Sequence, residues 1–222
     1  MPTTTWSALP RFRALLLLAV AACASRPDQP AQQQPPHKQE QASPLAALPA
    51  TFANTPGCDG CLALTLTLRP DGAYLVRERL GGSEFYDFGR WRQAADGLLL
   101  EGGRDAPRRY ALLPPDTLDS LEGTQGGNLR RQPRMENLRG PFRLTGLYNG
   151  SRFTECRTGL AWPVDESRAA GDLKQNYLKS ALGRARRPAL VVVDARLEQA
   201  GGGEEIRIQR SPVVLTAATC PG

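Results

Sequence analysis

The segment Leu62-Ala63-Leu64-Thr65-Leu66-Thr67-Leu68 carries the clearest structural pattern in this chain. Its leucines occupy every second position, and a period of two is typical of a β-strand with one apolar face. The residues that follow, Pro70-Asp71-Gly72, favour a tight turn, and Ala73–Leu80 then predicts an antiparallel partner strand. The sequence here predicts a β-hairpin that buries its leucines.

Short strands continue beyond this hairpin. Gly81-Gly82 breaks the second strand, and turn-forming residues then recur about every ten positions as far as Leu121. The further strands expected are Phe85–Arg92, Gly97–Leu100 and Arg109–Leu113, and no helix is expected among them. This spacing favours a small antiparallel β-barrel or sandwich over alternating strands and helices.

The C-terminal part shows a different order of elements. Residues 125–139 are rich in Gly, Pro and Arg and predict a linker between domains. A helix is expected over Ala169–Leu182, with Asp165 or Ser167 as its cap and Gly183 as its end. The expected strands are Pro141–Tyr148, Phe153–Arg157, Leu160–Val164, Ala189–Leu197 and Glu205–Ile208. Five strands with one helix between the third and fourth is the order of an OB-fold. We therefore expect a mostly β protein, with a small antiparallel barrel or sandwich at 48–124 and an OB-fold at 140–222.

The N-terminal 47 residues predict export and anchoring. A basic start and an apolar run lead to Val20-Ala21-Ala22-Cys23, which has the form of a bacterial lipoprotein signal with a lipobox. Loss of signal peptide 1–22 would leave Cys23 as a lipid-modified N-terminus, and Gln- and Pro-rich residues 23–47 as a tether. The alternative is an ordinary cleaved signal in which Cys23 is incidental. By similarity to bacterial lipoproteins, Ala24 indicates sorting to the outer membrane, with the protein facing the periplasm.

The charge balance bears on the partners of an exported chain. The 222 residues carry a net charge of +6, which falls to +4 when Arg11 and Arg13 leave with the signal peptide. Nucleic acid is not expected as a partner, because export removes the chain from it and the basic residues are scattered. Anionic lipid headgroups are the expected counter-surface.

Five cysteines leave an odd one to explain in an exported protein. Lipid attachment at Cys23 would explain it, and the other four can pair in three ways in an oxidising compartment. We favour Cys58–Cys61 together with Cys156–Cys220.

These features together resemble the NlpE-type outer-membrane lipoproteins, a family associated with copper resistance and envelope-stress signalling. The resemblance covers Leu48–Leu215 and includes a lipobox, two closely spaced cysteines and both halves in order. Its segments are Leu48–Phe52, Pro56–Cys61, Asp71–Tyr74, Phe88–Trp91, Phe153–Gly159 and Trp162–Val164. Where the family has Pro-Cys-Ala-Asp-Cys, this chain has an inserted Gly57 and an Asp directly after the first cysteine.

The resemblance implies a lipocalin-like barrel followed by an OB-fold, anchored to the outer membrane. It also implies an adaptor that reports surface attachment or lipoprotein mis-sorting to a sensor histidine kinase. In that family context, Cys156–Cys220 would be a disulfide that reports the redox state of the periplasm.

The Cys58-Asp59-Gly60-Cys61 segment has three interpretations. A thioredoxin-type redox pair needs a helix that starts at the first cysteine, whereas a β-pattern follows here. A Cu(I) site would use Cys58 and Cys61 as soft thiolate ligands, but no His or Met lies nearby in the sequence. A structural disulfide that fixes the entry to the first strand is the favoured interpretation, and no cofactor is required.

The sequence predicts a protein that is not an enzyme. Its single histidine, His37, lies in the tether, which excludes a histidine-dependent triad. The glycine-rich segments lack the Lys-Ser/Thr ending of a phosphate loop. Two alternatives to the adaptor stay open: a lipocalin-like carrier of a small apolar ligand, and a thiol oxidoreductase.

Overall fold

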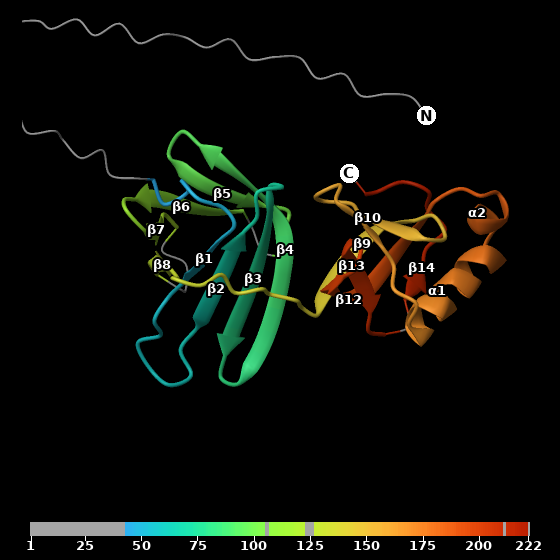
Figure 1. Ribbon diagram of the computed structural model, residues 1–222, viewed down its shortest axis with the longest axis horizontal. Helices are drawn as coiled ribbons and strands as arrows, with labels where there is room; N and C mark the ends of the chain where they lie inside the picture. The colour runs from blue at the N-terminus through green and yellow to red at the C-terminus, as the bar shows by residue number, and fades with distance from the viewer. Residues whose placement is uncertain (1–42, 105–106, 123–126, 211, 222) are drawn as a thin grey trace, which may run out of the picture. The chain divides into compact units, whose positions relative to one another are not determined.

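The computed structural model describes residues 43–104, 107–122, 127–210 and 212–221 (Figure 1). All of them lie in one compact unit that begins at Glu40. The expected signal peptide, the lipid-modified Cys23, His37 and most of the tether lie outside the described residues. The protein is mostly β, as the sequence predicts.

The N-terminal module is a closed barrel of eight antiparallel strands. Each strand pairs with its neighbours in the sequence, and the last strand pairs with the first to close the barrel. The strands are β1 (Ala50–Ala53), β2 (Ala63–Leu68), β3 (Ala73–Leu80), β4 (Ser83–Ala94), β5 (Gly97–Glu101), β6 (Arg108–Leu113), β7 (Thr117–Ser120) and β8 (Leu129–Arg131).

The predicted hairpin is confirmed as β2 and β3. Leu66 pairs with Val76, and Leu68 pairs with Tyr74. The turn closes with a hydrogen bond from the Arg69 N–H to the Ala73 carbonyl at 2.9 Å. Gly72 has a φ of 81° there, which only glycine adopts without strain. The alternating leucines point into the barrel, where they are removed from water.

Twelve buried side chains fill the barrel. They are Ala50, Phe52, Leu64, Leu66, Leu68, Tyr74, Val76, Leu98, Leu100, Tyr110, Leu118 and Leu129. Five of them, from Phe52 to Leu129, have no exposed surface at all. The alternating leucines therefore form a packed core.

The barrel extends beyond its expected end at residue 124. Strand β8 lies inside the stretch 125–139 that the sequence predicts as a linker. It is only three residues long and is surrounded by Gly, Arg and Pro, so it shows no period-two pattern of its own. Its partners are β1 and β7, and pairing with distant β1 supplies the hydrogen bonds that make it a strand.

The C-terminal module is a second antiparallel sheet with the strand order β11-β10-β9-β12-β13. Its strands are β9 (Phe142–Tyr148), β10 (Arg152–Glu155), β11 (Ala161–Pro163), β12 (Ala189–Ala200), β13 (Gly203–Ile208) and β14 (Val213–Val214), which pairs with β12. Val164, just after β11, forms a parallel bridge to Ile206 of β13 and curls the sheet towards closure. This is the strand order of the predicted OB-fold.

The expectation of one helix over Ala169–Leu182 is wrong in detail, because the structure divides it in two. α1 spans Arg168–Lys179 and α2 spans Ala181–Arg184. Ser167 caps α1, one of the two residues that the sequence offers. Ser180 has extended backbone angles, and its hydroxyl accepts a hydrogen bond from the Gly183 N–H at 3.0 Å, so it ends one helix and caps the next.

The two modules share a hydrophobic core. Phe88 of β4 lies on the outer face of the barrel and is 1% exposed. Its ring makes edge contacts with Phe142 at 6.0 Å and with Trp162 at 5.7 Å, both in the C-terminal module. Ala73 and Leu75 of β3 belong to the same core. The outer face of β3 and β4 is therefore buried as well as the inner one.

The segment between the modules is fixed to the barrel through Glu136. The Glu136 N–H donates to the hydroxyl of Thr51 at 2.9 Å, and the Glu136 carbonyl accepts from the hydroxyl of Thr67 at 3.1 Å. The Glu136 carboxylate pairs with Arg77 at 2.5 Å. Thr51 of β1 and Thr67 of β2 alternate with core residues and are buried, so this segment covers the outer face of β1 and β2.

Candidate functional site

Cys58 and Cys61 form a disulfide in the loop between β1 and β2, with their Cα atoms 5.2 Å apart. Asn54 fixes the base of this loop: its side chain donates to the Leu62 carbonyl at 2.8 Å and accepts from the Leu64 N–H at 2.7 Å. A shallow surface pocket lies beside the disulfide and is lined in part by Arg79 of β3. The disulfide thus fixes the entry to β2, as the favoured interpretation of the sequence expects.

The surroundings of Cys58–Cys61 do not match a thioredoxin-type redox pair. Such a pair places the first cysteine at a helix N-terminus, which lowers the pKa of its thiol. Here the loop leads directly into β2, which begins at Ala63. Cys58 therefore does not stand at the helix N-terminus that a thioredoxin-type site requires.

A copper site does not fit the disulfide form of this loop. A sulfur atom in a disulfide has no thiolate charge to offer a metal. Among the described residues, no group of three or more His, Cys, Asp or Glu side chains is placed to hold a metal ion. The expected Cu(I) ligands Cys58 and Cys61 could serve only after reduction.

The second disulfide, Cys156–Cys220, ties the chain's C-terminal tail to the second module. Its Cα atoms are 5.5 Å apart, and 64 positions of sequence separate the two cysteines. Cys156 directly follows β10, and its N–H donates to the Thr145 carbonyl of β9 at 2.9 Å. The tail before Cys220 runs along β12, where the Leu190 N–H donates to the Ala217 carbonyl at 2.8 Å.

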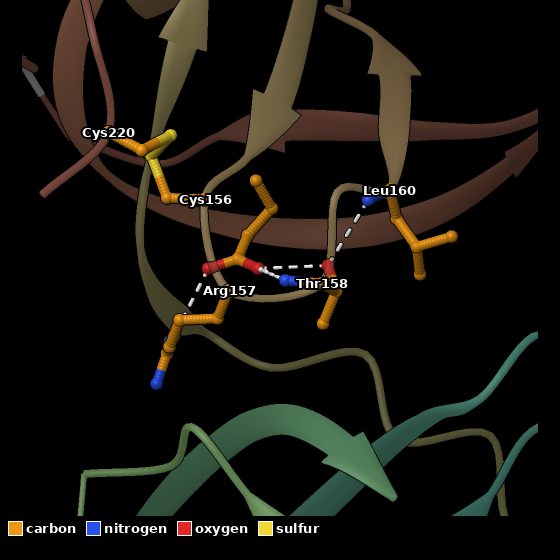
Figure 2. Close-up of a disulfide and its surroundings, with 6 residues drawn as sticks. Cys156, Arg157, Thr158, Leu160 and Cys220 are labelled. Carbon is orange, nitrogen blue, oxygen red and sulfur yellow. Dashed lines mark hydrogen bonds and ion pairs between the residues drawn. A yellow bond between two sulfur atoms is a disulfide. The ribbon is translucent and has the colours of Figure 1, made fainter. Parts of the chain in front are cut away.

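A fully buried carboxylate organises the turn beside this disulfide (Figure 2). Glu155 has no exposed surface. Its Oε2 accepts hydrogen bonds from the Thr158 N–H at 2.7 Å and from the Thr158 hydroxyl at 2.8 Å. Its Oε1 accepts from Nε of Arg157 at 3.1 Å, so both oxygens are satisfied and the charge is paired. The Glu155 side chain holds the turn 155–159 in one shape.

The same turn contacts the barrel. The Arg157 guanidinium donates to the Gly102 carbonyl and lies 3.7 Å from the Asp87 carboxylate of β4. In return, the guanidinium of Arg90, also in β4, donates to the Thr158 carbonyl. One short turn therefore carries the disulfide at its start and the contact between modules in its middle.

Sequence reasoning missed the roles of Glu155 and Arg90. Both lie in segments that carry the family resemblance, Phe153–Gly159 and Phe88–Trp91. Within these segments, only Cys156 was given a role from the sequence. A Glu directly followed by Cys-Arg-Thr-Gly could have indicated a carboxylate that caps its own turn. The pairing of Arg90 with that turn has no local signal, since 68 positions separate Arg90 and Thr158.

Of three comparisons with known proteins, only the one with solved structures finds a protein similar to this chain. No protein-family model matches it, and no curated protein matches it. Among solved structures, it is similar to the crystal structure of the Cpx pathway activator NlpE from Escherichia coli. The identity is 22% and the TM-score is 0.38, and the match covers 79% of this chain and 100% of that one. An identity and a TM-score this low do not assign a function.

In the part of the chain that the structure describes, no helix has the length and apolar character needed to span a bilayer.

Proposed function

We propose that this protein is an envelope lipoprotein that acts as an adaptor for stress signalling, anchored at Cys23 to the outer membrane and facing the periplasm. Its partner in this proposal is a sensor histidine kinase. The family resemblance over Leu48–Leu215 supports the proposal, and so does a fold of two β modules that contact each other at the turn 155–159. Its action is a change of contacts rather than a chemical reaction.

One observation carries the proposal: the turn 155–159 joins the Cys156–Cys220 disulfide to the barrel. Arg157 and Thr158 lie one and two positions after the disulfide-bonded cysteine, and both contact barrel residues. An oxidised pair fixes the start of this turn. Reduction leaves Cys156 free and removes the covalent tie of the C-terminal tail to β10.

Loss of the disulfide weakens the contact between modules in this proposal. Once the covalent tie is gone, the tail and β14 are held by their hydrogen bonds to β12 and by the packing of Val214 against the core. The barrel surface around Asp87 and Arg90 is then available to the kinase. The protein thereby converts a failure of disulfide formation into an exposed binding surface.

The test is the output of an envelope-stress reporter in cells that express variants of this chain. Cys156→Ser and Cys220→Ser should each raise the output, because each breaks the same disulfide. The matched control is the double variant Cys58→Ser/Cys61→Ser, which breaks a disulfide in the barrel loop and should leave the output near that of the unchanged chain. Immunoblots of the membrane fraction establish equal amounts of protein. Unchanged output in both single variants would contradict the proposal.

The alternative functions receive less support. The barrel interior is packed with its own side chains, which leaves the lipocalin-like carrier without a supporting observation. The thiol oxidoreductase lacks the helix that activates its cysteine. A copper-related role stays a prediction for the reduced form of Cys58 and Cys61.

A further inference from the structure

A dense group of cations lies at the C-terminal end of α1. Residues 178–187 hold four basic residues, and no Asp or Glu occurs between Leu173 and Val193. We call this segment the cationic hook; its outward side chains are Leu178, Lys179, Arg184, Arg186 and Arg187, and all five are exposed. None of the four basic side chains forms an ion pair with any residue that the structure describes.

The backbone of the cationic hook is tightly held. The Tyr177 hydroxyl donates to the Arg187 carbonyl at 3.0 Å, and the Arg187 N–H donates to the Leu182 carbonyl at 2.9 Å. Gly183 packs so closely that a Cβ atom there would lie 1.9 Å from the Tyr177 carbonyl oxygen. Arg186 has a φ of 54°, the positive-φ conformation that turns the chain back. The hook therefore presents its charges on a fixed scaffold.

Stabilisation of the helix accounts for only part of this charge. Cations in the last turn of a helix offset its dipole, and Lys179 and Arg184 occupy such positions in α1 and α2. Arg186 and Arg187 lie beyond α2, outside the last turn. They need another explanation, as does the exposed Leu178.

Leu178 adds an apolar contact to the cationic surface. Its side chain is 54% exposed, although α1 buries its other large apolar residues, Leu173 and Tyr177. Leu178 lies next to Lys179, with Lys174 one helical turn before it. Basic side chains around an exposed leucine are typical of surfaces that bind at a membrane interface.

We propose that the cationic hook binds the surface of an anionic phospholipid bilayer. Charge complementarity favours a phospholipid as the partner, because its phosphate is negative and the basic side chains of the hook have no carboxylate partner of their own. In Figure 1, α2 follows directly on α1 at one end of the second module, so the hook forms an end of that module. Binding there is separate from the lipid at Cys23 and from the signalling role of the disulfide.

The test is flotation of residues 24–222 with lipid vesicles. This chain lacks Cys23 but retains every residue of the unit that begins at Glu40. It should bind vesicles of phosphatidylcholine with phosphatidylglycerol and not vesicles of phosphatidylcholine alone, and added salt should release it. Each basic residue near an anionic surface contributes about 1 kcal/mol, or about fivefold in partitioning.

The decisive variant is Lys179→Gln/Arg186→Gln/Arg187→Gln, which should lower binding on the order of 100-fold. The contacts that hold the hook use the main chain of Arg186 and Arg187, so the fold should survive, as circular dichroism can verify. The matched control, Arg92→Gln/Arg104→Gln/Arg109→Gln, removes equal charge from exposed barrel positions and should bind normally.

Two results would overturn the proposal. An equal loss in the control would mean that net charge alone drives binding. Equal partitioning of the unchanged chain into both kinds of vesicle would mean that the cationic hook does not recognise anionic lipid. The hook would then face solvent or an acidic protein.

Discussion

Nη1 of Arg69 lies 2.8 Å and 2.9 Å from the two carboxylate oxygens of Glu204, although the residues are 135 positions apart in the sequence. Arg69 follows β2 of the barrel, and Glu204 belongs to β13 of the second module. Glu204 also accepts a hydrogen bond from Nε1 of Trp162 at 2.7 Å. Burial opposes the charge on Arg69, but Glu204 and Asp71 outweigh this and raise the pKa of its guanidinium. The pair joins the two modules by a polar contact next to their shared core.

The substitution Arg69→Ala should lower the free energy of unfolding by about 1–3 kcal/mol, because it leaves a half-buried Glu204 without its charged partner. Urea denaturation followed by tryptophan fluorescence measures the loss. The matched control is Arg92→Ala, whose pair with Glu101 is largely exposed and should cost less than about 1 kcal/mol. Equal losses in the two variants would mean that the Arg69–Glu204 pair does not join the modules.

The substitution Gly89→Ala should destabilise the barrel by about 1–3 kcal/mol through overpacking. A Cβ atom at Gly89 would lie 2.3 Å from the Glu101 carbonyl oxygen and 2.6 Å from the ring of Tyr74. Gly57→Ala is the matched control, because a Cβ there meets nothing within 4 Å. Thermal unfolding of the three chains checks the prediction, and a Gly89→Ala midpoint that equals the control would contradict it.

The substitution Glu155→Gln should destabilise the second module, because one carboxylate oxygen is replaced by an NH₂ group that cannot accept its hydrogen bond. The other oxygen can still accept from Thr158, so the expected loss is about 1–3 kcal/mol. Glu166→Gln, at an exposed position, is the control and should cost almost nothing. Urea denaturation under oxidising conditions keeps the Cys156–Cys220 disulfide intact in both variants. A variant as stable as the control would show that the turn 155–159 does not depend on this carboxylate.

The stability of the protein should fall at alkaline pH. Burial raises the pKa of Tyr110, although Arg108 opposes the shift, and burial also raises the pKa of Tyr148. The stabilising contribution of each neutral phenol is complete below its unfolded pKa of about 10. It is lost as the pH rises through the raised folded pKa, because the unfolded chain then binds fewer protons than the folded one.

Urea midpoints measured across this alkaline range check the pH prediction. Tyr110→Phe removes the strongly buried phenol and should flatten the decline. Burial also raises the pKa of Tyr86, which lies on the outer side of β4. The variant Tyr86→Phe is therefore compared with Tyr110→Phe and with the unchanged chain. A decline that is identical in all three chains would exclude ionisation of Tyr110 and of Tyr86 as its cause.

Copper binding should depend on the redox state of Cys58 and Cys61. Calorimetric titration of the oxidised chain with Cu(I) should detect no binding tighter than micromolar, because neither sulfur is a thiolate. Any such site should appear only after reduction and should be absent from Cys58→Ser/Cys61→Ser. Tight binding by the oxidised chain would contradict the prediction and indicate ligands elsewhere.

Local sequence was enough to predict most of the strands. The alternating leucines and the Pro70-Asp71-Gly72 turn predict β2 and β3, because the period of side chains and the chemistry of turns are properties of neighbouring residues. The order of the C-terminal elements likewise predicts the OB-fold. The helix was predicted in position, but its division at Ser180 was missed because Leu178 and Leu182 keep helical spacing across it.

The candidate sites were only partly predictable. The structure pairs Cys58 with Cys61 and Cys156 with Cys220, the arrangement that the sequence favours among three. The buried carboxylate of Glu155 was missed because its role depends on the shape of the turn that it holds. The expectation that the basic residues are scattered is wrong for the cationic hook, where four of them gather within 178–187. Their exposure and lack of ion pairs are properties of the fold, which the sequence does not show.

The sequence by itself determined the inner face of the barrel, since the leucines at every second position of β2 must leave water whatever surrounds the hairpin. Only the tertiary structure decided what covers the outer face: Thr51 and Thr67 meet Glu136, Phe88 meets Phe142 and Trp162, and Arg69 meets Glu204. It also decided that β8 closes the barrel on β1. These contacts join residues far apart in the chain. A local pattern shows which side chains share a face, whereas the partner of that face depends on how the whole chain packs.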